Sequence, residues 1–281
     1  MKLLRYGPPG REKPGLLDGE GAVRDLSGEV EDIAGEALLP DSIARLKALD
    51  PAALPRVAGS PRLGPCVGRV GKFPAIGLNY SDHAAEAGLP VPGEPLIFTK
   101  ATSSICGPND DTVVPRGSTK LDYEVELGIV IGKPVKYIDE SDAVSHIAGY
   151  CVVNDVSERA FQIDGTGQWV KGKSADTFGP IGPWLVTPDE VPDPQALDLW
   201  TEVDGQRRQD GNTRTMIFGV FHLVSYVSRY MSLQSGDVIT TGTPPGVGMG
   251  MKPPGFLQPG QRVRVGVAGL GEQEQLVVTE G

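Results

Sequence analysis

Glycine and proline divide this chain into short segments. Among its 281 residues, 38 are glycine and 25 are proline, and both residue types interrupt regular structure. The apolar runs between them are short and β-like, as in "EVELGIVIG" (124–132), "GPWLVTP" (182–188) and "EQLVVTE" (274–280). Many short strands with few helices favour a mixed α+β fold that is mainly β, with antiparallel or mixed sheets, over a regular alternation of strands and helices.

Two segments have helical patterning. The segment "PDSIARLKALDPAAL" (40–54) has apolar residues at helical spacing, with Asp41 or Ser42 as its N-cap. The strongest predicted helix runs from Thr215 to Leu233 and is apolar on nearly every side, which indicates a buried helix. We expect a small N-terminal α+β domain with its Pro/Gly-rich linker over 1–70, and a main domain over 71–281.

Charge and cysteine content argue against several classes of protein. Lys and Arg number 26 and Asp and Glu 36, a net charge of −10, and no basic run is dense enough to follow phosphates, so nucleic acid is not an expected partner. The cysteines, Cys66, Cys106 and Cys151, are scattered, which argues against a disulfide framework or a thiolate zinc site. No signal-peptide core and no apolar run of about 18 residues is present, so we expect a cytoplasmic protein without a membrane partner.

Three acids alternate with other residues in "LDYEVELGIVIG". On a strand, Asp122, Glu124 and Glu126 would share one face. Two carboxylates about 4 Å apart repel by roughly 4 kcal/mol at an effective dielectric near 20, so a buried acidic face needs water, a shared proton or a cation. A solvated outer face is the alternative. The apolar run that follows, however, indicates that the later half of the strand is buried on both faces.

A further acid, Asp155, ends another apolar run in "IAGYCVVNDVSERAFQ". With Glu124 and Glu126 it would complete an all-oxygen site for Mg²⁺ or Mn²⁺, with Asp122 as a fourth candidate near the rim. Asp155 could also open a helix. Arg159 and Gln162 would then follow at i+4 and i+7 on one helical stripe, although an N-cap aspartate with an exposed arginine explains the same pattern.

The chain has three histidines, and one of them has a notable neighbour. His83 lies in "SDHAAEA" three residues before Glu86, so the two side chains would share a face of a short helix. Such a helix is marginal alone and suits a mobile lid whose carboxylate orients an imidazole to activate water. An exposed surface pair is the alternative. His222 is interpreted as a core or interface histidine and His146 as structural.

One motif match is rejected. The segment "GQWVKGKS", Gly167 to Ser174, fits the phosphate-binding pattern G-x-x-x-x-G-K-S. That mechanism needs a buried strand before the loop and a helix after it. The preceding residues are polar, and Gly179, Pro180 and Pro183 forbid a long helix afterwards. We therefore predict no nucleotide as ligand.

From Phe73 onward the chain resembles the fumarylacetoacetate hydrolase family. Five motifs stand in the family's order: "GLNYSDHAAEAG" is similar to the lid with its His-x-x-Glu pair, "LDYEVELGIVIGK" to the two-glutamate metal strand, "VVNDVSERAFQ" to the third ligand with its Arg/Gln helix, "KGKSADTFGP" to the catalytic-lysine segment, and "DVITTGTPPGVG" to the substrate loop. The resemblance implies a mixed β-roll or sandwich, a homodimer or dimer of dimers, and a bound Mg²⁺ or Mn²⁺.

The resemblance also implies roles for individual residues. His83, Glu86 and Lys173 would be catalytic, and Glu124, Glu126 and Asp155 would hold the metal. Substrate would be bound by Arg159, Gln162, Thr243, Tyr80 and Lys100. The larger eukaryotic members place a fourth acid ligand upstream of the lid histidine, whereas this chain has no acid close enough except Asp82. We expect three protein carboxylates on the metal, with more water.

The implied reaction is hydrolysis of a C–C bond in a 2,4-diketo acid, releasing pyruvate and a smaller acid. The stretches "FTKATSSICGP" and "MGMKPPGFLQPG" are most similar to bacterial members that act on 2,4-diketo-3-deoxy sugar acids, the rhamnonate or fuconate forms, which give a hydroxy acid such as lactate. Acylpyruvate hydrolysis, oxaloacetate decarboxylation and keto–enol isomerisation are alternatives within the family. A non-catalytic cation-binding protein is the alternative outside it.

Overall fold

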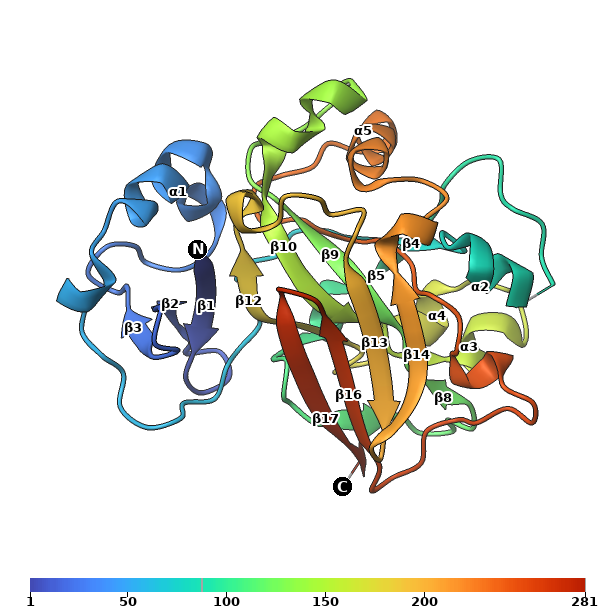
Figure 1. Cartoon of the computed structure of the whole chain (residues 1–281). Coiled ribbons are helices and arrows are strands. Elements are labelled where there is room, and N and C mark those ends of the chain that lie inside the picture. Colours follow the sequence, from blue (N-terminus) through green and yellow to red (C-terminus); the bar gives the residue numbers. More distant parts are fainter. Residues whose placement is uncertain (87, 281) are drawn as a thin grey trace.

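The computed structural model describes residues 1–86 and 88–280 (Figure 1). Within these residues the helices are short: α1 (Pro40–Lys47), α2 (Ser81–Glu86), α3 (Arg159–Ile163), α4 (Val170–Lys173) and α5 (Val220–Tyr230). Strands dominate: β1 (Lys2–Tyr6), β2 (Lys13–Leu17), β3 (Val23–Asp25), β4 (Phe73–Gly77), β5 (Leu96–Lys100), β6 (Ile105–Cys106), β7 (Thr112–Val114), β8 (Leu121–Asp122), β9 (Val125–Ile131), β10 (Ile147–Asn154), β11 (Ser157–Glu158), β12 (Gly179–Val186), β13 (Asp198–Val203), β14 (Gln206–Asn212), β15 (Val238–Thr240), β16 (Arg262–Val267) and β17 (Gly271–Thr279). Gly281, the end of the predicted main domain, lies outside the described residues.

One large sheet forms the centre of the molecule. Its strand order is β3-β2-β1-β12-β10-β9-β15-β4-β5, with β6 paired to β12. In its middle β9 and β10 run antiparallel, with Glu126 opposite Val153. Every residue of these two strands is buried, which confirms the prediction that the run after the acids is covered on both faces.

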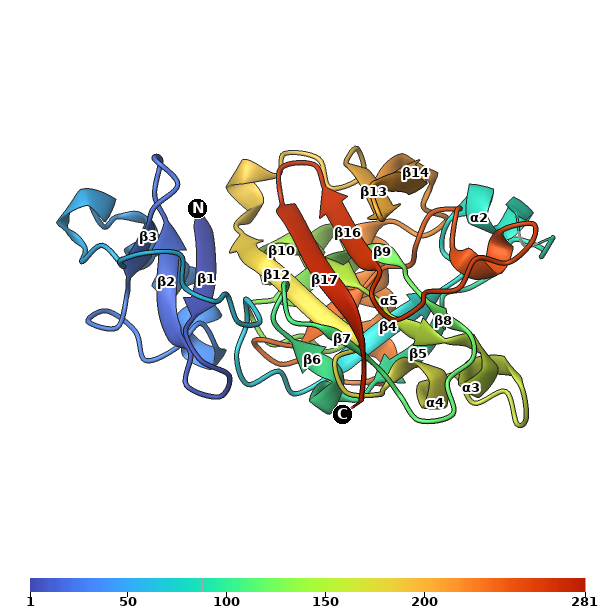
Figure 2. The same ribbon diagram turned by 90° about the horizontal axis from the view of Figure 1, so that it is seen from below.

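A second sheet, β14-β13-β16-β17-β7, packs over one face of the first (Figure 2). Leu127 of β9 lies with Val265 of β16 in one hydrophobic core, whereas Val130 points to the opposite face and joins a core with Leu38. This alternation follows from the two-residue period of a strand. The predicted fold class, mixed α+β and mainly β with a sandwich core, is confirmed.

The first seventy residues contribute β1–β3 and α1 beside this sandwich (Figure 2). β1 pairs with β12, with Leu3 opposite Leu185, so this unit extends the large sheet. α1 begins at Pro40 with Leu39 as its N-cap, so the cap predicted at Asp41 or Ser42 was wrong. Proline at the first helical position starts a helix without needing its missing N–H. The domain boundary at residue 70 stays a prediction.

The helix predicted from Thr215 to Leu233 is shorter in the structure. α5 begins at Val220, since Thr213–Thr215 form a separate 3-10 turn and Gly219 is the N-cap. Its inner side is buried, but Tyr230 is 62 % exposed. His222 is half-buried beside Glu140 rather than in the core, because it stands on the outer side of this amphipathic helix.

Three short helices gather at one end of β9 and β10, around the small β8–β11 pair (Figures 1 and 2). α2 is the predicted lid helix; Ala87, which the prediction included, lies outside the described residues. The P-loop look-alike follows α3 rather than a strand, and its own helix α4 ends at Lys173. The strand–loop–helix frame of a phosphate-binding loop is therefore not formed over these residues.

Candidate active site

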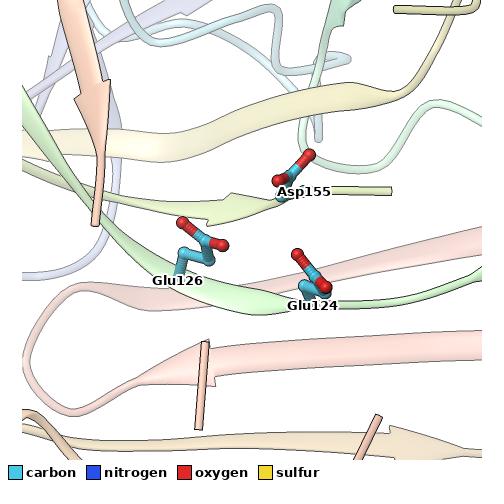
Figure 3. A group of neighbouring side chains, drawn as sticks. All are labelled: Glu124, Glu126 and Asp155. Atoms are coloured by element: carbon cyan, nitrogen blue, oxygen red, sulfur yellow. The ribbon is translucent and has the colours of Figure 1, made fainter. Parts of the chain in front are cut away.

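Three buried carboxylates meet where β9 and β10 end. Glu124, Glu126 and Asp155 each offer an oxygen atom, and these atoms lie within 4.8 Å of one another. Figure 3 shows the three side chains turned toward a common centre; Glu126 stands on β9, Glu124 directly before it, and Asp155 directly after β10. The strands are locked here, since Asp155 N donates to Glu124 O at 2.9 Å. The sequence spacing therefore produced the predicted cluster.

The two glutamates have opposite electrostatic environments. Burial, together with Asp155 and Glu124, raises the pKa of Glu126 well above its usual value. Burial acts the same way on Glu124, but Arg159 and Lys173 outweigh it and lower the pKa of Glu124. Backbone and hydroxyl donors also fix Glu126, which accepts from Gly242 N at 2.7 Å and from Thr240 Oγ1. One glutamate is thus ionised by fixed cations, and the other lacks a cation of its own.

Three cationic side chains surround the carboxylates. Lys173 Nζ donates to Glu124 Oε2 and Asp155 Oδ2, both at 2.7 Å, and those acids raise the pKa of Lys173 against the effect of burial. Arg159 Nη2 donates to Glu124 Oε1 at 2.6 Å. Lys100 Nζ donates to the other oxygen of Asp155, Oδ1, at 2.5 Å, and it also donates to the carbonyl of Lys173. It therefore supports Asp155 and does not line the cavity described below.

Asp122 does not share the acidic face, contrary to the alternation seen in the sequence. The strand is interrupted at Tyr123 and Glu124, so β8 and β9 are separate elements. Because the period of two is broken there, the Asp122 carboxylate turns to Arg159 Nε, at 2.8 Å. It is fully buried and is not one of the clustered ligand atoms.

Helix α2 brings His83 to the same place. His83 Nδ1 lies 3.2 Å from Glu86 Oε2, which is the predicted i, i+3 contact. Glu86 in turn accepts from Gly246 N at 3.1 Å, which docks the helix on the substrate-loop segment. With Nδ1 held by the carboxylate, the other ring nitrogen, Nε2, is free to act as a base.

A cavity of about 150 Å³ lies between the carboxylates and α2. Its polar lining includes seven of the predicted site residues: His83, Glu124, Glu126, Arg159, Gln162, Lys173 and Thr243. Apolar side chains make up the other walls: Ile76, Leu78, Leu89, Phe98, Ile163, Trp169 and Met249. Neither Tyr80 nor Lys100 belongs to this lining, so the structure does not place these two predicted substrate contacts against the cavity.

Two buried amides that hold the site were not found from the sequence. Gln209 accepts from Val125 N at 3.0 Å and donates to Thr243 Oγ1 at 2.8 Å, so it ties the ligand strand to the substrate loop. Asn154 accepts from Glu124 N at 3.0 Å. Gln209 stands in the polar run "QRRQDGN", which reads as a surface strand and gives no sign of a buried member.

The donor set fits a hard divalent cation. All three candidate ligands are carboxylate oxygens, which Mg²⁺ and Mn²⁺ prefer. Four buried acids face three buried cations here, counting Asp122 with the cluster, so one negative charge is in excess. The Tyr80 hydroxyl is also buried, and it has no hydrogen-bond partner among the described residues. A divalent cation bound here would neutralise Glu126, which has hydrogen-bond donors but, within residues 1–86 and 88–280, no cationic hydrogen-bond partner of its own.

Comparison with known proteins decides the family. The model of the fumarylacetoacetate (FAA) hydrolase C-terminal region matches residues 72–278. The chain belongs to the fumarylacetoacetate hydrolase family. It is 68 % identical to a protein of Burkholderia multivorans named "Putative hydrolase", and the match covers 98 % of both chains.

Solved structures of this family have the same fold. The fumarylacetoacetate hydrolase of psychrophilic Exiguobacterium antarcticum matches with a TM-score of 0.87 and 36 % identity, covering 100 % of both chains. A probable 2-hydroxyhepta-2,4-diene-1,7-dioate isomerase of Mycobacterium abscessus matches with a TM-score of 0.84 and 34 % identity, again over 100 % of both. The family thus contains hydrolases and isomerases, and this chain is an enzyme of that kind. None of its described helices is long and apolar enough to cross a membrane.

Proposed function

We propose that this protein is a metal-dependent hydrolase that cleaves the C3–C4 bond of a 2,4-diketo acid to give pyruvate and a smaller acid. One observation carries the proposal: Glu124 and Glu126 line the same cavity as His83, with Asp155 clustered beside the glutamates and Glu86 in contact with His83. Decarboxylation and keto–enol isomerisation need the triad but no attacking water, and an isomerase would use His83 only to transfer a proton.

Glu124, Glu126 and Asp155 would hold Mg²⁺ or Mn²⁺. When bound, the ion would supply Lewis-acid chemistry, stabilising negative charge that develops on the keto-acid end of the substrate. With four acids, three cations and a divalent ion, the cluster would carry a net charge of +1. An anionic diketo acid can then enter without meeting an excess of negative charge.

The side chains of the cavity perform the proton transfers. His83 Nε2 takes a proton from water, and Glu86 stabilises the imidazolium through Nδ1. The hydroxide adds to C4, where the Lys173 ammonium and the Gln162 amide stabilise the oxyanion. When the C3–C4 bond breaks, its electron pair forms the pyruvate enolate, and the proton held on His83 returns to C3. Arg159 keeps Glu124 ionised and oriented throughout.

The chemistry of the cavity walls indicates which group the substrate carries beyond its 2,4-diketo acid part. The resemblance favours a 2,4-diketo-3-deoxy sugar acid, rhamnonate or fuconate form, with a hydroxy acid such as lactate as second product. Much of the lining, however, is apolar: Phe98 and Trp169 pack edge to face at 5.4 Å, and Ile163 and Met249 also line the cavity. Hydroxyl groups against such walls lose hydrogen bonds to water. This observation favours a second candidate, an acylpyruvate with a short apolar acyl group, since an apolar cavity of about 150 Å³ holds a molecule of roughly benzene size.

A substrate panel tests the proposal and separates these candidates. Pyruvate release is measured with Mg²⁺ or Mn²⁺ on acylpyruvates of increasing chain length, on the two deoxy sugar acids and on oxaloacetate. We expect hydrolysis of 2,4-diketo acids that stops when EDTA removes the metal. Decarboxylation of oxaloacetate with no hydrolysis of any diketo acid would overturn the proposal. If the apolar wall binds the acyl group, Trp169→Ala should lower kcat/KM for longer acylpyruvates and leave kcat/KM for the sugar acids unchanged.

A further inference from the structure

Asp122 is a buried acid that the proposed chemistry does not use. Its two oxygens accept four hydrogen bonds. Oδ1 accepts from Tyr123 N at 3.0 Å and Gly248 N at 2.7 Å, and Oδ2 accepts from Met249 N at 3.0 Å and Arg159 Nε at 2.8 Å. One carboxylate therefore joins a strand end, a loop and the arginine of the active site.

The loop that Asp122 holds is the one on which the lid helix docks. Gly246 N donates to both oxygens of Glu86 at 3.1 Å. A Cβ at Gly250 would lie 2.9 Å from the Glu86 carboxyl carbon, and a Cβ at Gly248 would lie 2.6 Å from Asp122 Oδ1. The glycines thus allow Glu86 to approach residues 246 and 250, and Asp122 to approach residues 248 and 249, of the same loop.

Arg159 continues the connection to the acidic triad. While Nε is held by Asp122, Nη2 donates to Glu124 Oε1 at 2.6 Å and Nη1 to Gln162 Oε1 at 3.1 Å. The guanidinium is rigid and planar, so fixing Nε also fixes the direction of the two donors that reach the cavity. A continuous chain of contacts therefore runs from Glu86 through residues 246–249, Asp122 and Arg159 to Glu124.

We propose that Asp122 is a positioning residue that couples the docking of helix α2 to the orientation of Glu124. The consequence for turnover depends on the function proposed above, but the coupling itself does not. When Glu86 docks on Gly246, the loop is held against Asp122, and Arg159 is aimed at Glu124. When α2 undocks and the loop loosens, Asp122 is held less firmly, and Arg159 loses the fixed position of one of its three partners.

Hydrogen exchange on the metal-free protein tests the coupling without any assay of activity. Asp122→Asn replaces one acceptor oxygen with an NH₂ group, so at least one pair of donors loses its partner. The reporter is the amide of Ala84 in α2, which donates to Tyr80 O at 2.9 Å. We expect its exchange to become about fivefold faster or more, through local opening of the helix. Unchanged exchange in α2, with changes confined to residues beside Asp122, would overturn the proposal.

The matched control is Asp237→Asn. Asp237 is also fully buried and accepts from Lys72 N and Gln234 N, both at 2.8 Å, and from Lys72 Nζ, but it does not contact residues 246–249. Its variant should leave the Ala84 amide unchanged. Equal acceleration in both variants means general loosening and also contradicts the coupling. If Asp122→Asn does not fold, Gly248→Ala disturbs the same contact without changing any charge, since its Cβ would lie 2.6 Å from Asp122 Oδ1 and 2.5 Å from the Gly255 carbonyl oxygen. The same acceleration at Ala84 is expected.

A double-mutant cycle adds a readout that general destabilisation does not move. Independent changes in kcat/KM multiply to within about twofold. If Asp122 and Glu86 act through one loop, Asp122→Asn combined with Glu86→Gln should lose at least about fivefold less activity than the product of the single losses. Strict multiplication, with wild-type exchange at Ala84, would show that the two carboxylates act separately. Absence of hydrolysis in the parent enzyme would refute the proposed function and leave the exchange test to decide the coupling.

Discussion

The acidic triad and the lid helix face each other across one cavity, but they are built in opposite ways. The triad lies at the start of β9 and directly after the end of β10, and both strands are buried along their whole length. Lys173, Arg159 and Lys100 hold its carboxylates in place. The lid helix α2 has six residues, and hydrogen bonds of Ser81, Asp82 and Glu86 hold it to neighbouring loops. A metal site needs fixed geometry, and a cover needs to move. We therefore expect loss of a triad residue to lower both the stability and the activity of the protein. Loss of His83 or Glu86 should lower the activity alone.

The largest effect is expected from Asp155→Ala. The substitution removes a metal ligand and leaves Lys100 and Lys173 buried without their shared partner. Breaking a buried ion pair from one side destabilises a protein by about 3–5 kcal/mol, so both metal affinity and stability should fall. Urea unfolding measures the stability of the metal-free protein, and electron paramagnetic resonance measures bound Mn²⁺.

Asp164→Ala is the control for that variant, because Asp164 is exposed and pairs only with Lys120. It should change stability by less than about 1 kcal/mol. An Asp155→Ala protein that keeps the parent's stability and Mn²⁺ affinity would contradict the idea of a rigid acidic triad.

The next largest effect is expected from His83→Ala. General-base assistance contributes about 10²–10⁴-fold, so hydrolysis of 2,4-diketo acids should fall by that factor while Mn²⁺ binding and stability stay unchanged. Any decarboxylation of oxaloacetate should fall much less, because it needs no activated water. Both activities are measured at saturating Mg²⁺. Hydrolysis near the parent rate would mean that the lid is only a cover.

A smaller effect is expected from Glu86→Gln. The amide can still accept from His83 Nδ1, but it lacks the charge that favours imidazolium, and one of its two contacts with Gly246 N is lost. We expect a loss of hydrolysis smaller than that of His83→Ala, with the metal affinity retained. A larger loss than that of His83→Ala would show that Glu86 itself, and not the imidazole, activates water.

No effect is expected from nucleotides. Calorimetry with ATP or GTP should give no heat of binding at Gly167–Ser174, because α3 and not a strand precedes this segment. Micromolar affinity that disappears in Lys173→Ala would reverse this expectation and would also remove Lys173 from the proposed oxyanion site.

The local features of this protein, its strands and the spacing of neighbouring side chains, could be predicted from the sequence alone. Alternation and the ends of apolar runs predicted the strands that carry Glu124, Glu126 and Asp155, and the spacing of His83 and Glu86 predicted their contact. These features depend on the period of a strand or a helix, which a single sequence contains. Where the period was interrupted, as at Tyr123 and Glu124, the extrapolation to Asp122 failed.

Which polar groups from distant segments form hydrogen bonds with one another depends on the tertiary structure. Asp122 faces Arg159 and the loop at Gly248, and Gln209 bonds both Val125, 84 positions before it, and Thr243, 34 positions after it. Lys100 was predicted to touch substrate, yet it lies behind Asp155. The reason is physical: a buried polar group must find a partner, and which partner lies within hydrogen-bond distance is set by the packing of two sheets, not by any spacing along the chain.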